Sequence, residues 1–99
     1  MREQFCIIPM HLLEYSKKNP RQEIMNLEEL AANIKEYGIL EPIIVKPIEE
    51  RFEVIVGERR VRAAAMAGLK EVPAIIRNLT DQQADEIRLI ENIHSLEVV

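Results

Sequence analysis

Four short apolar runs limit the folds open to this sequence more than any other feature. They lie at residues 4–9 (QFCIIP), 43–46 (IIVK), 52–56 (FEVIV) and 72–79 (VPAIIRNL). Each run is bounded by proline, glycine or polar residues and is too short for a core helix, whereas strands commonly have this length and composition. We therefore predict four strands. The mostly polar residues 11–25, which Pro20 interrupts, predict one turn of helix and then a loop.

A first helix is predicted between the first two runs. Its apolar residues follow the i, i+3, i+4, i+7 spacing of a helix buried on one face, at Leu27, Leu30, Ala31 and Ile34. Asn26 and Glu29 have the form of a capping box at its start. Gly38 stands where helices commonly end.

A second helix is predicted over the segment GERRVRAAAMAG, which begins at Gly57 and stops at Gly68. Helical geometry assigns its residues to two faces. The face expected to pack on the core carries Val61, Ala64, Ala65 and Gly68, and the opposite face carries Arg59, Arg62, Ala63 and Met66.

A third helix is predicted from about Asp81 into the segment RLIENIH. Thr80 and Gln83 offer a capping box at its start. Its expected buried stripe is Ala84, Ile87 and Ile90. The order strand, helix, strand, strand, helix, strand, helix predicts an α+β fold with a small mixed sheet packed with helices.

Composition limits the classes of protein to which the chain can belong. Its 99 residues suffice for one small domain, residues 1–99, and a content of 47% hydrophobic and 30% charged residues is typical of a soluble globular protein. No apolar run approaches the roughly 20 residues of a membrane span. The single Cys6 excludes an internal disulfide and fits the cytoplasm. The net charge of −4 favours a compact ligand over a long polyanion.

The arginines that open the second helix stand where the helix dipole disfavours cations. Arg59, Arg60 and Arg62 follow Gly57 directly. Backbone N–H groups at a helix start form an anion site, and arginine binds phosphate oxygens through two parallel hydrogen bonds. A bound polyphosphate would make the arginines favourable. The alternative is a surface helix whose arginines pair with nearby glutamates.

Acidic residues in the third helix suggest a metal site beside the phosphates. Glu91 falls on the same side as the apolar stripe, and a buried carboxylate is costly unless it meets a cation. Asn92 adds a neutral oxygen, and Glu58 adds a carboxylate if the two helices converge. Such oxygen ligands suit Mg²⁺. The alternative is that Glu91 lies at the solvated edge of the stripe and pairs with Arg59 or Arg62.

Four blocks of this sequence carry a resemblance to a known family. The blocks are NPRQ (19–22), LEELAANIKEYGILEPIIVKP (27–47), GERRVRAAAMAGLKEVPAIIRNL (57–79) and ENIH (91–94). Together they resemble the N-terminal domain of ParB-type chromosome-partitioning proteins. The resemblance implies the ParB/sulfiredoxin-like α+β fold. It also implies a nucleotide switch that binds CTP with Mg²⁺ and closes as a clamp on DNA.

The resemblance also assigns roles to individual positions. The implied nucleotide-binding residues are Arg21, Gly57, Glu58, Arg59, Arg60, Arg62 and Asn92, and the implied metal ligands are Glu58, Glu91 and Asn92. Gly57, Arg59 and Arg60 would cradle the triphosphate, and the segment from Gly38 to Pro42 would help to line the base pocket. Glu91 would assist hydrolysis of CTP, which would be slow at most.

Two positions depart from the family pattern. Glu41 stands where the family often has glutamine, and Ser95 where it commonly has an arginine for the phosphates. The 99 residues contain no helix-turn-helix region. We therefore expect DNA to be bound weakly or through regions outside this chain. The resemblance further implies self-association, a nucleoid-associated place in the cytoplasm, and no membrane contact.

Two other functions stay open at this point. One is an interaction module that uses the fold without nucleotide and presents its arginines to the phosphates of DNA or to an acidic protein. The other is a nucleotide-dependent kinase or nucleotidase with Glu58 or Glu91 as the general base. Sulfiredoxin-like chemistry is excluded, because it needs a cysteine where this chain has Glu58.

Overall fold

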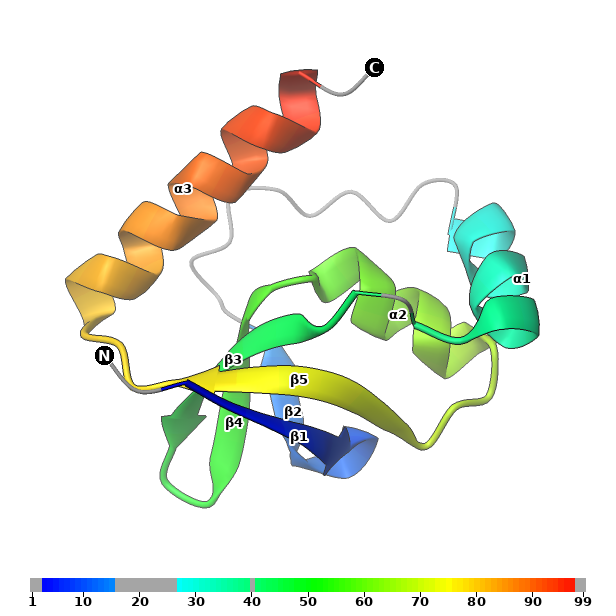
Figure 1. Cartoon of the computed structure of the whole chain (residues 1–99), viewed down its shortest axis with the longest axis horizontal. Coiled ribbons are helices and arrows are strands. Elements are labelled where there is room, and N and C mark those ends of the chain that lie inside the picture. Colours follow the sequence, from blue (N-terminus) through cyan, green and yellow to red (C-terminus); the bar gives the residue numbers. More distant parts are fainter. Residues whose placement is uncertain (1–2, 16–26, 40, 98–99) are drawn as a thin grey trace.

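The computed structural model describes residues 3–15, 27–39 and 41–97, of which residues 91–97 are described only by their place in a helix. Five strands form one sheet, in the spatial order β1-β5-β3-β4-β2 (Figure 1). The strands are β1 (Glu3–Pro9), β2 (Leu13–Tyr15), β3 (Ile43–Ile48), β4 (Arg51–Val56) and β5 (Glu71–Arg77). The sheet is mixed: β1–β5 and β3–β4 pair antiparallel, and β3–β5 and β2–β4 pair parallel. The four predicted strands and the α+β class are confirmed.

The strand β2 was not predicted and corrects the expected loop. A short 3₁₀ turn, η1 (Met10–Leu12), precedes it, so the single turn of helix is present, but Leu13–Tyr15 then pairs with β4. An Nη2 group of Arg51 also donates to the carbonyl of Leu13 at 3.0 Å. A strand of three residues is too short to show an alternation of apolar and polar side chains in the sequence. Leu13–Tyr15 is a strand because it pairs with β4. The rest of the predicted loop lies outside the described residues.

Two helices, α1 (Leu27–Tyr37) and α2 (Glu58–Met66), pack on one another and cover one face of the sheet. The predicted stripe of α1 is confirmed: Leu27, Ala31 and Ile34 are buried and Leu30 is half-buried against the same core. Cys6 also packs against this core. The predicted cap at Asn26 lies outside the described residues.

The predicted faces of α2 were partly wrong. Val61 and Ala64 are buried as expected, but Ala63 is fully buried, and Ala65 and Gly68 are exposed. The buried face is rotated because α2 packs on α1 as well as on the sheet, and Ala63 belongs to the core cluster that the residues of α1 and the sheet share. Small side chains at these positions let the two helices approach closely.

The third helix, α3 (Asp81–Glu97), touches the sheet through its first turns and then rises away from it (Figure 1). Its start is the predicted capping box, since Thr80 and Gln83 exchange two hydrogen bonds at 2.9 and 3.1 Å. Ala84 and Ile87 pack against Ile55 and other residues of a second apolar cluster. Ile55 adjoins Val54 of the main core in β4, so it faces the other side of the sheet.

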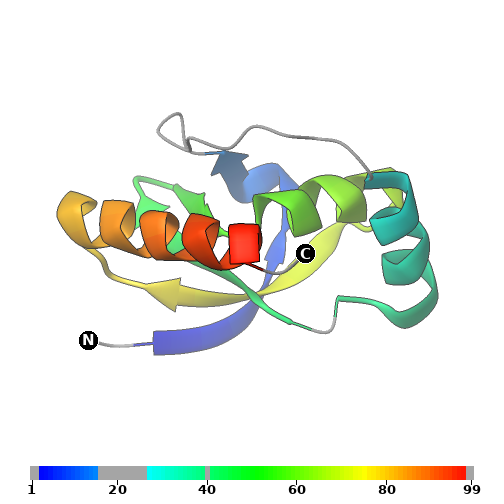
Figure 2. The same cartoon turned by 90° about the horizontal axis from the view of Figure 1, so that it is seen from above.

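The predicted stripe of α3 was wrong at its third position. Ile90 is 55% exposed, and Arg88 is buried in the turn before it. The stripe extends past the point at which α3 leaves the strands (Figure 1). In the view from above, α3 (orange to red) runs along the molecule toward α2 (green) (Figure 2). No helix in the described part of the chain is long and apolar enough to cross a membrane.

Candidate functional site

Helix α2 begins at a glycine that no other residue could replace without strain. Gly57 has φ 106° and ψ 24°, a left-handed conformation that side chains rarely adopt. A Cβ at this position would lie 2.7 Å from Cγ2 of Ile43 in the neighbouring strand. Gly57 therefore lets the chain turn from β4 into α2 while its backbone lies against β3.

The same glycine leaves the positive end of α2 open to an anion. Val61 donates its N–H to the carbonyl of Gly57 at 3.0 Å and so closes the first turn. The N–H groups that precede Val61 in the helix have no intrahelical acceptor. Gly57 has no side chain with which to cap them. Such a helix start favours an anionic group.

Arg60 folds back over this helix start onto the segment that leads into β3. Its Nη1 donates to the carbonyl oxygens of Glu41 at 3.0 Å and Pro42 at 2.9 Å. Its Nη2 lies 3.0 Å from Oε1 of Glu41. The guanidinium of Arg60 therefore connects the start of α2 to the segment that the resemblance assigns to the base pocket.

Arg62 and Glu58, which lie one helical turn apart in α2, form a second ion pair. Nε of Arg62 donates to Oε2 of Glu58 at 3.0 Å, and the Glu58 side chain is only 13% exposed. The guanidinium of Arg62 also lies 4.1 Å above the ring of Tyr15 in β2. Partial burial raises the pKa of Tyr15, with Arg62 opposing this effect and Glu58 adding to it. The alternative prediction that arginines of this helix pair with glutamates is therefore confirmed for Arg60 and Arg62.

The remaining predicted site residues are placed less fully. Arg59 is exposed on the first turn of α2. Glu91 and Asn92 lie in α3, but their side chains are not described, and Arg21 lies outside the described residues. Among the residues that the structure describes, no three His, Cys, Asp or Glu side chains are grouped so that they could hold a metal ion.

Two partners of the site were missed by sequence reasoning. Nothing in the sequence indicated that Tyr15 lies beside α2, because the strand that contains it was not predicted. Glu41 was noted only as a departure from the family pattern, and nothing in the sequence connected it to Arg60.

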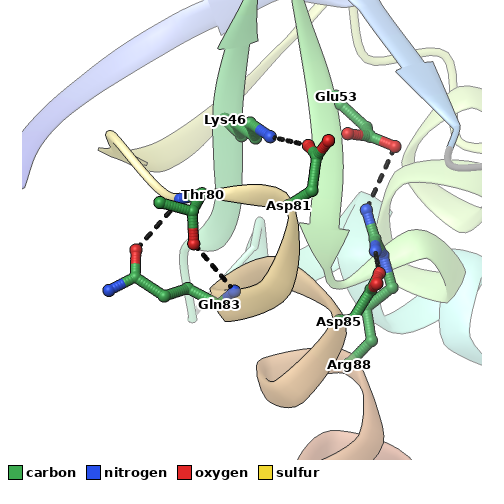
Figure 3. A network of polar contacts seen from close by, with 7 residues as sticks. All are labelled: Lys46, Glu53, Thr80, Asp81, Gln83, Asp85 and Arg88. Carbon is green, nitrogen blue, oxygen red and sulfur yellow. Dashed lines mark hydrogen bonds and ion pairs between the residues drawn. The ribbon is translucent and has the colours of Figure 1, made fainter.

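A separate polar network fastens α3 to the sheet (Figure 3). Arg88, whose side chain is 5% exposed, pairs with Glu53 of β4 at 3.0 Å and with Asp85 at 2.7 Å. Lys46 of β3 pairs with Asp81 at the start of α3. Nε of Arg88 is buried without a hydrogen-bond partner in the described part of the chain. These ion pairs fix the point at which α3 leaves the sheet. The turn of α3 that contains Glu91 and Asn92 begins just beyond that point.

Known proteins match nearly all of this chain. The family model of the ParB N-terminal domain matches residues 1–93. The probable chromosome-partitioning protein ParB of Coxiella burnetii is 48% identical over 88 residues, which cover 87% of this chain and 30% of that protein. The chain thus spans about 30% of the length of that relative.

Solved structures match the fold as well. A C-terminally truncated ParB from Caulobacter crescentus, complexed with CTP-γ-S, has a TM-score of 0.86 at 38% identity, covering 92% of this chain and 53% of that one. A C-terminally truncated ParB from the same organism, complexed to the centromeric parS site, has a TM-score of 0.81 at 34% identity, covering 94% and 49%. Sulfiredoxin from Arabidopsis thaliana shares the fold, with a TM-score of 0.69 at 21% identity and coverage of 85% and 96%. The predicted ParB/sulfiredoxin-like fold is confirmed, and the chain belongs to the ParB N-terminal domain family.

Proposed function

We propose that this domain binds CTP at the start of α2 and acts as a nucleotide-dependent switch in a DNA-partitioning protein. The observation that carries the proposal is Gly57, whose left-handed backbone opens the positive end of α2 beside Arg60. The CTP-γ-S complex of the Caulobacter relative, at 38% identity, supports the choice of nucleotide.

The phosphate chain would meet two kinds of donor at this place. The first kind is the backbone N–H groups after Gly57, and the second is the proposed charged donors Arg59, Arg60 and Arg62. Arg21 and Asn92 complete the proposed set by resemblance to the family, and Glu58 belongs to it by position. The pairing of Arg62 with Glu58 would orient the arginine toward this end of the helix.

Mg²⁺ is proposed to accompany the nucleotide, because it neutralises the phosphate charge. The proposed ligands are Glu58, Glu91 and Asn92. Oε2 of Glu58 already accepts from Nε of Arg62, so a metal ion at Glu58 would compete with this pair. Glu91 is also the residue proposed to assist hydrolysis, which we expect to be slow at most.

The function of the whole protein is proposed from its relatives. The family includes chromosome-partitioning proteins, and a Caulobacter relative has been solved on a parS site. We therefore assign residues 1–99 to a single nucleotide-binding domain of a cytoplasmic, nucleoid-associated protein. It would self-associate, and it would bind DNA mainly through regions outside these residues.

The test is calorimetry of the 99-residue chain with CTP, ATP, GTP and UTP in the presence of Mg²⁺. We expect CTP to bind, and removal of Mg²⁺ by a chelator to weaken its binding. Arg59→Ala should lower the affinity about tenfold or more, because a charged hydrogen bond contributes roughly 1.5–3 kcal/mol. Arg77→Ala is the control, since Arg77 of β5 pairs with Glu3 of the edge strand β1 and belongs to no part of the proposed site. Absence of heat with every nucleotide at millimolar concentration would contradict the proposal.

One observation favours a second candidate, an interaction module that works without nucleotide. Arg60 and Arg62 are paired with carboxylates of the chain itself, so the charges of these two guanidinium groups are already neutralised without a nucleotide. Under this alternative the arginines of α2 would meet the phosphates of DNA or an acidic protein, and the same calorimetry would give no nucleotide binding.

A further inference from the structure

Arg60 makes two different kinds of contact with the Glu41–Pro42 segment. Nη1 donates to two backbone carbonyls, at 3.0 and 2.9 Å, and these bonds fix the segment. Nη2 instead meets the carboxylate of Glu41 at 3.0 Å. The first contacts involve neutral groups and are structural, whereas the second neutralises the charge of the arginine.

The position of the guanidinium makes this charge pairing significant. A Cβ at Gly57 would lie 3.5 Å from Cζ of Arg60, so the guanidinium lies beside the N-cap residue of α2. The positive helix end and the arginine therefore act on the same region, and the carboxylate paired with this arginine is Glu41. Both features would also attract a phosphate.

The two partners are held with unequal strength. The side chain of Arg60 is 20% exposed and is fixed by its carbonyl contacts, whereas the side chain of Glu41 is 76% exposed. An exposed ion pair contributes at most about 1 kcal/mol. The carboxylate can therefore swing into solvent while Arg60 stays in place.

We infer that Glu41 is an internal competitor for the phosphate chain, occupying Nη2 of Arg60 until a nucleotide displaces it. This inference rests on the proposed function, since it concerns the regulation of that same site. Displacement costs the Glu41–Arg60 pair, and the freed carboxylate then repels the bound phosphates. Glu41 thus raises the nucleotide concentration at which the domain responds.

The test compares the CTP affinity of the wild-type chain with that of Glu41→Gln and Glu41→Ala, measured by calorimetry with Mg²⁺. Both variants should bind about fivefold more tightly, which corresponds to the roughly 1 kcal/mol of an exposed pair. Glu36→Gln is the matched control: it removes the same charge from an exposed position of α1, and it should change the affinity less than twofold. A misfolded variant would lose affinity, so a gain identifies the competition.

The outcomes separate this inference from the proposed function. If the wild-type chain binds CTP and neither Glu41 variant binds more tightly than Glu36→Gln, the competition is wrong and the nucleotide site stands. If no variant binds CTP, both proposals fall. Inorganic tripolyphosphate, which lacks a base, should show the same gain, because the competition concerns phosphate alone. Equal tripolyphosphate affinities in all four chains would also overturn the inference.

Discussion

Gly57 meets two demands that arise from different parts of the fold. Its φ of 106° comes from the turn between β4 and α2, and the lack of space at its Cα comes from Ile43 in β3. Gly68, at the end of α2, meets only the first demand: its φ is 86°, and a Cβ there would have nothing within 4 Å. The two glycines therefore differ in sterics and share their backbone conformation.

Replacing each of these glycines by alanine should separate the cost of the left-handed backbone conformation from the cost of the steric clash with Ile43. Gly68→Ala should lower the free energy of unfolding by about 1 kcal/mol, the low end for a strained backbone conformation. Gly57→Ala should cost about 1–3 kcal/mol more, because overpacking against Ile43 is added. Urea unfolding followed by circular dichroism measures both. Equal losses would show that the contact with Ile43 relaxes freely.

At the scale of elements, α3 is attached to the sheet by charge as much as by apolar burial. Arg88 is buried between Glu53 and Asp85, and beyond it Leu89 and Ile90 are exposed. A buried charge is tolerated only while it is paired. The attachment of α3 therefore depends on Glu53, the partner that the sheet supplies.

Glu53→Gln should lower the free energy of unfolding by about 2–3 kcal/mol, because it leaves Arg88 buried with only Asp85 as a charged partner. The double variant with Arg88→Met should recover part of this loss, since it removes the buried charge that Glu53 no longer neutralises. Glu3→Gln, which breaks the exposed pair with Arg77, is the control and should cost less than about 1 kcal/mol. Denaturant unfolding measures all three chains, and equal losses for the two glutamine variants would contradict a buried role for Glu53.

At the scale of the whole molecule, charge limits what the chain can bind. The net charge is −4, and several of its arginines are already paired with carboxylates. Sequence-independent binding to duplex DNA needs a basic face that releases counterions. A domain of this charge suits a small ligand held by a few directed donors.

The 99-residue chain should therefore bind random-sequence duplex DNA with a Kd weaker than about 10⁻⁴ M at physiological salt, the weak limit for non-specific binding. Fluorescence anisotropy with a labelled duplex, at two salt concentrations, measures this. Micromolar binding that falls steeply with salt would contradict the prediction and favour the nucleotide-independent module.

Much of the fold could be predicted from local pattern. The four longer strands, the stripe of α1, the stop at Gly38 and the capping box at Thr80 all follow from residues within a few positions of one another. The glycine and arginines of α2 were likewise readable as a candidate phosphate site. Their roles as ligands stay predictions, as do those of Arg21, Glu91 and Asn92.

The remaining features were decided by contacts between distant parts of the chain. The strand β2 exists through β4, Ala63 is buried in the core that α2 shares with α1 and the sheet, and Ile90 is exposed because α3 has already left the sheet. Arg60 reaches Glu41, 19 positions earlier, only because β3 lies beside the start of α2. Periodicity determines which residues share a face, since that follows from backbone geometry. Which neighbour covers that face, and which charge meets which, depends on how the whole chain closes around its core.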